Sequence, residues 1–403
     1  MQQQNRSQFE FVVLMAALMS IVALSIDAVL PALPMIGEYL SVNNPLDNPK
    51  LITSIFLGLG IGQLIFGPLS DSFGRKPIVY VGFILFIIAS IICVTTKSFE
   101  MMLFGRVLQG IALASPRTMC IAMVRDSYDG DYMAKILSIV VMVFILVPVV
   151  APTIGQFLMH HYGWKSIFTF NTAFGILVVL WYWLRQPETL KDKYRIPYRL
   201  SIFKTGTIQF FKIRAAVIYT LLSGFITGSF MVYLSTSQQI FEKQYDLAEE
   251  FPLIFASLAI SVGLATFFNS QLVIKFGMKR IVHLAMWSFI LTSLVFIILF
   301  SSKANPSIEV LITFFALQFF TIGFLFGNLR ALAMEPMGHI AGIGSALNGF
   351  ISTVMAVPIA NHIGGFVINS VTPLFIGFLA CGIISLLLFY INSSKAAKIL
   401  RKI

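Results

Sequence analysis

The stretch FGRKPIV, Phe73–Val79, recurs 203 residues later as FGMKRIV, Phe276–Val282. Each copy follows the second long apolar segment of its half of the 403-residue chain. A further pair, VPVVAPTIG at Val147–Gly155 and VPIANHIGG at Val357–Gly365, falls in the fifth apolar segment of each half. Motifs repeated in the same order predict a chain built from two equivalent halves.

The composition predicts an integral membrane protein. The chain is 58% hydrophobic and only 11% charged, more apolar surface than a soluble fold could bury. Met1–Glu10 is polar, and the apolar run after it is too long for a signal peptide and has no small-residue cleavage site. The three cysteines lie in apolar segments, so we expect packing residues rather than disulfides.

Twelve apolar stretches are long enough to cross a bilayer as helices. We expect them near residues 11–36, 51–69, 78–96, 101–124, 135–159, 166–185, 214–241, 251–274, 280–300, 308–335, 342–368 and 373–392. The predicted fold is all-α, with transmembrane helices in two pseudo-symmetric six-helix halves. The expected divisions are an N-terminal half at 1–185, a cytoplasmic central loop at 186–213, a C-terminal half at 214–392 and a cytoplasmic tail at 393–403.

The basic residues predict the orientation. Of the 28 lysines and arginines, 20 fall on the side of the two termini, five on the opposite side and three within helices. Because cytoplasmic loops collect lysine and arginine, both termini are expected in the cytoplasm of a bacterium, beneath its inner membrane. The net charge of +11 then faces anionic lipid, and we expect no nucleic-acid partner.

Several motifs carry a family resemblance. They are GPLSDSFGRKPIV from Gly67, RVLQG at Arg106–Gly110, PVVAPTIGQ from Pro148, SIDAVLPALP at Ser25–Pro34 and MVRDSY at Met123–Tyr128. Together they resemble the major facilitator superfamily, its drug:proton antiporters, and the Bcr/CflA drug-resistance branch. Ala151 and Gln156 stand where the antiporter motif usually has glycine, which weakens the inference of efflux.

The first motif implies a cytoplasmic latch that holds one face of the transporter shut. Gly67 allows close helix approach, and Gly74 allows a tight turn. Asp71 can act as an anion at a facing helix N-terminus, and Arg75 can pair with Asp126. The alternative is a plain solvated turn.

The second copy of this motif has Ile274 where Asp71 would fall, so any latch is expected on one half only. In the fifth span, Pro148 and Pro152 remove backbone donors and bend the helix, while Gly155 permits close packing. The resemblance implies an antiport role for these three residues. Simple helix packing would need the same residues.

Asp27 alone of the 17 carboxylates lies well inside an expected span. A low-dielectric interior favours the neutral form of a carboxyl group, which suits a group that must bind and release a proton. Arg106 lies at a similar depth in the fourth span, so we expect the two to form a switchable pair that couples protons to transport. A permanent salt bridge that only fixes packing is the alternative.

Arg117 and Arg330 also lie within spans, each seven residues after a glycine, Gly110 or Gly323. We therefore expect the two arginines to be equivalent and to clamp one anionic group. The neutral side chains that could add hydrogen bonds are Asn328, Asn361, His362, Gln238 and Gln239. In the alternative, Arg330 snorkels or pairs with Glu335, and Arg117 pairs with Asp126.

The leading hypothesis is a monomeric, proton-coupled antiporter that exports a small molecule by alternating access. The arginines favour an anionic cargo such as a carboxylate siderophore or metabolite. The alternatives are a broad exporter of the chloramphenicol and bicyclomycin type, a proton-coupled importer of organic anions, and a receptor that no longer transports. We expect no enzyme activity, no metal and no cofactor besides the proton, because no nucleotide loop, metal-ligand cluster or hydrolytic triad is visible.

Overall fold

The structure, a computed structural model, describes residues 7–128, 130–195, 200–300 and 305–400, and some side chains within 130–145, 200–202, 338–341 and 393–400 are left out. Parts of the predicted N-terminal half, central loop and tail therefore lie outside the described residues. The described chain is helical and contains no strand. It divides into two compact units, unit 1 over Met1–Arg199 and unit 2 over Leu200–Ile403.

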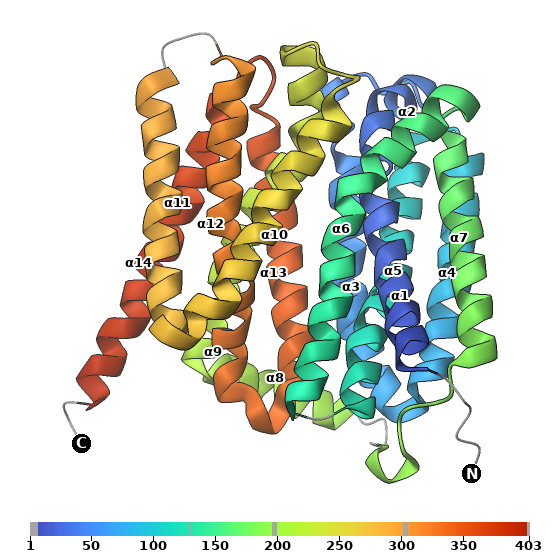
Figure 1. The fold of residues 1–403 in the computed structure, drawn as a ribbon, viewed down its shortest axis with the longest axis vertical. Helices are drawn as coiled ribbons and strands as arrows, with labels where there is room; N and C mark the ends of the chain where they lie inside the picture. The colour runs from blue at the N-terminus through green and yellow to red at the C-terminus, as the bar shows by residue number, and fades with distance from the viewer. Residues whose placement is uncertain (1–6, 129, 196–199, 301–304, 401–403) are drawn as a thin grey trace. The chain divides into compact units, whose positions relative to one another are not determined.

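Unit 1 contains six long helices (Figure 1). They are α1 (Gln8–Asp27), α3 (Lys50–Phe73), α4 (Arg75–Thr95), α5 (Phe99–Ser127), α6 (Gly130–Tyr162) and α7 (Lys165–Arg185). The first expected span continues past α1 through a 3-10 turn, Leu30–Ala32, into the short helix α2 (Leu33–Tyr39). Pro31 and Pro34 lie at the starts of these two pieces, where proline's missing N–H is tolerated.

Unit 2 repeats the six long helices and adds one short helix before them. They are α8 (Leu200–Lys212), α9 (Arg214–Gln239), α10 (Phe251–Phe276), α11 (Met278–Phe300), α12 (Ile308–Met334), α13 (Ala341–Gly364) and α14 (Thr372–Leu400). α8 lies within the segment that we expected to be a loop, and it packs at one end of unit 2 against α9 and α13 (Figure 1).

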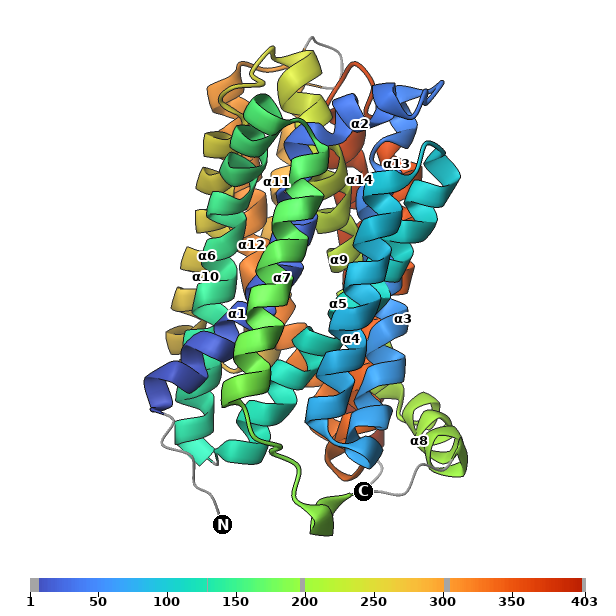
Figure 2. The same ribbon diagram turned by 90° about the vertical axis from the view of Figure 1, so that its right-hand side faces the viewer.

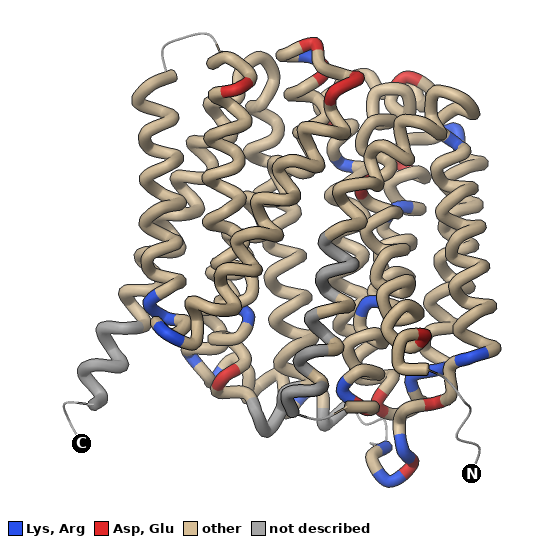
Figure 3. The backbone as a smooth tube through the Cα atoms, viewed as in Figure 1, with Lys and Arg blue, Asp and Glu red and all other residues tan. Residues whose placement is uncertain are grey.

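Eleven described segments are long and apolar enough to cross a membrane, by length and composition. The remaining expected span, the fifth, corresponds to α6, where several side chains are left out of the description. Charged residues gather at the ends of the helices, and the middle of each unit carries few of them (Figure 3). This distribution is the one that a bilayer requires, because charge is costly at mid-membrane depth.

α1 packs against α5, α6 and α7 of unit 1, and Figure 2 shows it running behind α7. Its residues from Met19 to Asp27 are all buried, so the helix is enclosed on every side at this depth. A polar group near the end of α1 is therefore surrounded by protein rather than by lipid, which makes this helix end the natural place to begin the site.

Candidate functional site

Asp27 is the last residue of α1 and is 5% exposed. No other carboxylate in the described part of the chain is buried to this degree. The chain leaves the α-helix immediately after it, because the 3-10 turn that contains Pro31 follows. Asp27 is therefore buried within unit 1, and its role as the acid of a span stays a prediction.

Arg106 on α5 approaches the same end of α1. Its Nη1 donates to the carbonyl oxygen of Ser25 and to Oε1 of Gln109, both at 3.0 Å, and its Nε donates to the carbonyl oxygen of Leu51 at 3.0 Å. Gln109 in turn donates to the hydroxyl of Ser90 at 2.9 Å. The guanidinium, 1% exposed, is thus held by neutral oxygens from α1, α3 and its own helix.

Asp27 and Arg106 are close in the fold but do not form an ion pair here. Within the described residues, Asp27 has no recorded hydrogen bond or ion pair, and Arg106 contacts α1 at Ser25, two residues earlier. The Nη2 of Arg106 has no hydrogen-bond partner. The switchable pair thus remains a prediction, with the two groups apart in this structure.

Gly155, which belongs to the fifth-span motif on α6, lies directly against the segment that follows Asp27. A Cβ added to Gly155 would lie 1.9 Å from the carbonyl oxygen of Ala28, closer than any real contact. Only glycine permits α6 to approach α1 at this height. α6 continues as one helix through Pro148 and Pro152, and it brings the motif beside the candidate coupling residue.

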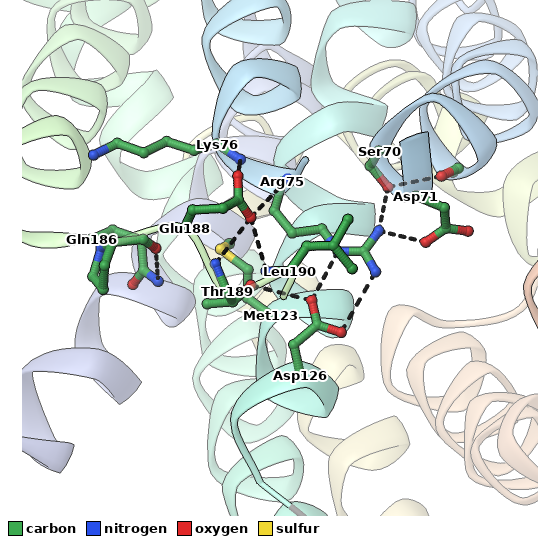
Figure 4. A network of polar contacts seen from close by, with 12 residues as sticks. Ser70, Asp71, Arg75, Lys76, Met123, Asp126, Gln186, Glu188, Thr189 and Leu190 are labelled. Atoms are coloured by element: carbon green, nitrogen blue, oxygen red, sulfur yellow. Dashed lines mark hydrogen bonds and ion pairs between the residues drawn. The ribbon is translucent and has the colours of Figure 1, made fainter. Parts of the chain in front are cut away.

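The latch predicted at the α3–α4 turn forms a dense polar network in unit 1 (Figure 4). Arg75, whose side chain is 3% exposed, binds Asp71 at 2.6 Å and Asp126 at 2.9 Å and also donates to the hydroxyl of Ser70 at 2.7 Å. Gly74 has φ +102°, which L side chains rarely adopt. Ser70 in turn donates to the carbonyl oxygen of Gly67 at 2.7 Å.

Glu188, which follows α7, belongs to the latch but was missed from the sequence. Its carboxylate accepts from the backbone N–H of Arg75 at 3.0 Å and of Lys76 at 2.9 Å, so it caps the N-terminus of α4 (Figure 4). We expected a carboxylate such as Asp71 in that role, but Asp71 binds Arg75 instead. Thr189 adds a hydrogen bond to Asp126 at 3.2 Å. The sequence signal was the polar triplet PET directly after the sixth span.

The equivalent turn in unit 2 keeps the backbone geometry without the ion pairs. Gly277 has φ +76°, and no atom lies within 4 Å of a Cβ added to it. Ile274, at the position of Asp71, is 88% exposed. Among the described residues, the ion pairs of the latch lie in unit 1 alone.

The neutral residues proposed to contact substrate divide into two groups. Three of them, Gln238, Gln239 and Asn328, are buried in unit 2 and donate to Glu242, to the carbonyl oxygen of Val367 at 3.2 Å, and to Asn269 at 2.6 Å. The other two, Asn361 and His362 on α13, are exposed in the structure. Each of the three buried amides therefore already donates at least one hydrogen bond within unit 2.

Equivalent contacts within the two units show which residues of α5 and α12 correspond to each other. The 203-residue offset between the two turn motifs relates Ser90 to Ser293, and these serines accept at 2.9 Å from Gln109 and Gln318 respectively. The two glutamines are 209 residues apart.

A second pair of contacts gives the same two offsets between the units. A Cβ added to Gly62 of α3 would lie 2.5 Å from Cβ of Ala114, and a Cβ added to Gly323 would lie 2.6 Å from Cβ of Ala265. Gly62 and Ala265 are 203 residues apart, whereas Ala114 and Gly323 are 209 apart. Gly323 thus corresponds to Ala114.

This register corrects the equivalence that we expected for the two arginines. Arg117 corresponds to Phe326, and Arg330 lies four residues, about one helical turn, further along its helix. The expected match of Gly110 with Gly323 was wrong. Gly110 packs against the carbonyl oxygen of Ile55, whereas Gly323 packs against Ala265, the residue that corresponds to Gly62.

The alternative pairings expected for the arginines are also not seen. Asp126 binds Arg75 and Thr189 rather than Arg117, and Glu335 forms no ion pair with Arg330 within the described residues. Arg117 is half-buried in unit 1, and Arg330 is exposed in unit 2. A clamp formed by both arginines stays a prediction.

The described geometry defines a class of protein: a multi-pass helical membrane protein with two six-helix repeats, a buried acid and a buried arginine that binds the same helix two residues earlier. Residues 15–360 match the family model described as Major Facilitator Superfamily. A bicyclomycin resistance protein homolog of Haemophilus influenzae is 26% identical over 98% of this chain and 99% of its own length. The multidrug resistance protein MdtL of Shewanella oneidensis is 30% identical over 80% of this chain and 81% of its own.

A crystal structure of a D-xylose-proton symporter has the same fold, with a TM-score of 0.74 and 14% identity over 94% of this chain and 97% of its own. The chain belongs to the Major Facilitator Superfamily, and its relatives agree with the Bcr/CflA drug-resistance branch that its motifs resemble. It is a membrane transporter and not an enzyme.

Proposed function

We propose that this transporter exports chemically diverse, uncharged or weakly charged drugs across the bacterial inner membrane in exchange for protons. Its relatives include proteins named for bicyclomycin resistance and for multidrug resistance. These names favour the broad-exporter alternative over the anionic siderophore or metabolite that the two arginines suggested. Both termini face the cytoplasm in this proposal, because the basic residues gather on their side.

One observation carries the proton coupling: Asp27, the buried acid of unit 1, comes two residues after Ser25, whose carbonyl oxygen binds an arginine that neutral oxygens hold. A carboxyl group enclosed by protein and freed from its cation binds a proton readily, because burial penalises its charged form. A proton that enters from outside would neutralise Asp27. Its release to the cytoplasm would let the carboxylate attract Arg106 and reset the transporter.

An anionic cargo is less well supported. The anion clamp required Arg117 and Arg330 to be equivalent, and Arg330 lies about one turn beyond that position. An organic-anion importer rests on the same two arginines and shares this weakness. We therefore assign the site to drugs that make mainly apolar and neutral hydrogen-bond contacts.

Expression in a bacterium that lacks its own drug exporters tests the export of drugs. Cells that make the wild-type protein should accumulate less chloramphenicol than cells with an empty vector, and a protonophore should abolish the difference. Citrate, supplied as a polycarboxylate probe to everted vesicles, should not be transported. Transport of citrate without any effect on chloramphenicol would favour the anionic alternative.

A further inference from the structure

Three helices of unit 1 meet at the turn of α1 that precedes Asp27. Arg106 of α5 donates to the carbonyl oxygen of Ser25 at 3.0 Å, and Asn171 of α7 donates from Nδ2 to the carbonyl oxygen of Leu24 at 3.5 Å. The guanidinium carbon of Arg106 lies 5.7 Å from the ring centre of Phe168, one turn before Asn171 on α7. Arg106 and Asn171 therefore approach the same junction from two different helices, α5 and α7.

Three buried polar atoms at this junction have no hydrogen-bond partner: Nη2 of Arg106, Oδ1 of Asn171 and Oγ of Ser25. The three residues are 1%, 3% and 1% exposed, so bulk water does not reach their side chains freely. A buried donor or acceptor without a partner is unfavourable, because it has lost its hydrogen bonds to water. Arg106 supplies a donor, Asn171 supplies an acceptor and Ser25 can be either, so the three atoms are chemically complementary.

We propose that Asn171 is a positioning residue that receives Arg106 when Asp27 is protonated. The inference rests on the proposed proton-coupled function. Arg106 alternates between the carboxylate of Asp27 and a neutral position made by the carbonyl of Ser25, Gln109 and Oδ1 of Asn171, reached directly or through one water. Asn171 stabilises the state in which Arg106 has left Asp27, and so it sets the pH at which the transporter switches.

The other charged and titratable groups on the helices around this junction are few, and we assign the titration to Asp27. α4 contributes Cys93, whose sulfur would lie 2.8 Å from a Cβ on Gly105. At the start of α3, Lys50 is paired with Asp47 at 2.7 Å. At the start of α7, Lys165 donates to the Tyr39 hydroxyl at 3.1 Å. α6 carries no charged residue between Pro148 and Gly155.

The test uses purified full-length protein in liposomes with an imposed pH difference and chloramphenicol as the probe. Asn171→Leu removes the neutral acceptor, so the state with protonated Asp27 becomes less stable. The midpoint of the pH dependence of the transport rate should move about one unit to lower pH, the equivalent of one hydrogen bond to a charged group. Asn171→Asp supplies a permanent anion to Arg106 and should reduce proton-driven transport at least about tenfold, the effect of roughly 1.4 kcal/mol.

Thr172→Val is the matched control, because the Thr172 hydroxyl binds only the carbonyl oxygen of Phe168 in its own helix, at 2.7 Å. Its pH midpoint should equal that of the wild type. If Asn171→Leu and Asn171→Asp both match Thr172→Val while the wild type is proton-driven, the inference is wrong and the proposed function stands. If the wild type itself shows no proton-driven transport, the proposed function fails. Should Asn171→Asp not reach the membrane, the pH midpoint of Asn171→Leu decides alone.

Discussion

The surroundings of Arg106 bear most directly on the proposed switch between Asp27 and neutral acceptors. Arg106 is buried and makes three hydrogen bonds to neutral oxygens, while one guanidinium nitrogen keeps a free donor. Such an environment holds the cation without neutralising it, so a small energetic preference decides whether it binds Asp27. A residue poised in this way can respond to a single proton.

Arg106→Lys should be nearly as harmful as Arg106→Ala. Lysine keeps the charge, but its single ammonium cannot reproduce the fork that reaches Leu51, Ser25 and Gln109 together. We expect both variants to reach the membrane and to lose proton-driven chloramphenicol transport. Transport assays in liposomes measure this, and wild-type transport by Arg106→Lys would show that the fork geometry is unimportant.

Arg330→Gln should leave the affinity for chloramphenicol unchanged, because the proposed cargo needs no cation at this position. The anion clamp predicts instead that either Arg117→Gln or Arg330→Gln weakens binding of an anionic substrate by roughly ten- to a hundredfold. Calorimetry with chloramphenicol and with citrate on purified single variants distinguishes the two. Citrate binding by the wild type that either variant weakens would restore the anionic interpretation.

At the scale of helices, two contacts in unit 1 join segments far apart in the sequence: the cap that Glu188 places on α4 and the close approach of α6 to α1 at Gly155. Each can be removed by one substitution, and each has a control elsewhere in the chain.

Glu188→Gln should lower the free energy of unfolding by about 0.5–2 kcal/mol, the usual range for a lost helix cap. It weakens the charged acceptor that two N–H groups of α4 share. Asp192→Asn is the control, because Asp192 is largely exposed and pairs only with Arg195 on the surface. Thermal unfolding in detergent measures both variants, and an equal Tm for the two would remove Glu188 from the latch.

Gly155→Ala should lower the free energy of unfolding by about 1–3 kcal/mol and impair transport, because the new methyl group overlaps the carbonyl oxygen of Ala28. Gly327→Ala is the control: a Cβ there meets nothing within 4 Å, and alanine favours a helix. We expect that control to be neutral or slightly stabilising. Wild-type stability and transport by Gly155→Ala would show that α6 can shift freely.

The sequence predicted the helices and the tight α3–α4 turn well because their signals are local. Apolar runs mark the spans, and a glycine with positive φ such as Gly74 leaves a recognisable turn motif. Asn171 could not be predicted, because its partner lies on a helix distant in the sequence, and Glu188 had only the weak signal of the polar triplet PET. The position of Arg330 was misjudged because α11 and its connection to α12 together have six more residues than α4 and its connection to α5, which changes the offset between repeats from 203 to 209 residues.

At the scale of the whole molecule, the two repeats have diverged in chemistry while they keep their framework. The serine–glutamine contact is present in both units. At the offset of 209 residues, however, Arg106 corresponds to Phe315, which stacks on Phe319 and Phe375 in an aromatic cluster. Among the described residues, unit 1 therefore carries the buried charges of the coupling site, and unit 2 carries aromatic packing at the equivalent place.

The most direct test of proton-coupled drug export compares wild-type protein with Asp27→Asn in liposomes whose interior is made acidic. Chloramphenicol is uncharged, so a pH difference alone does not concentrate it. Wild-type liposomes should accumulate the drug above the outside concentration and lose it when a protonophore is added, because protons that leave drive the drug inward. Asp27→Asn liposomes should only equilibrate, since the variant has no group at this position to carry the proton. Accumulation by Asp27→Asn equal to that of the wild type would contradict the account.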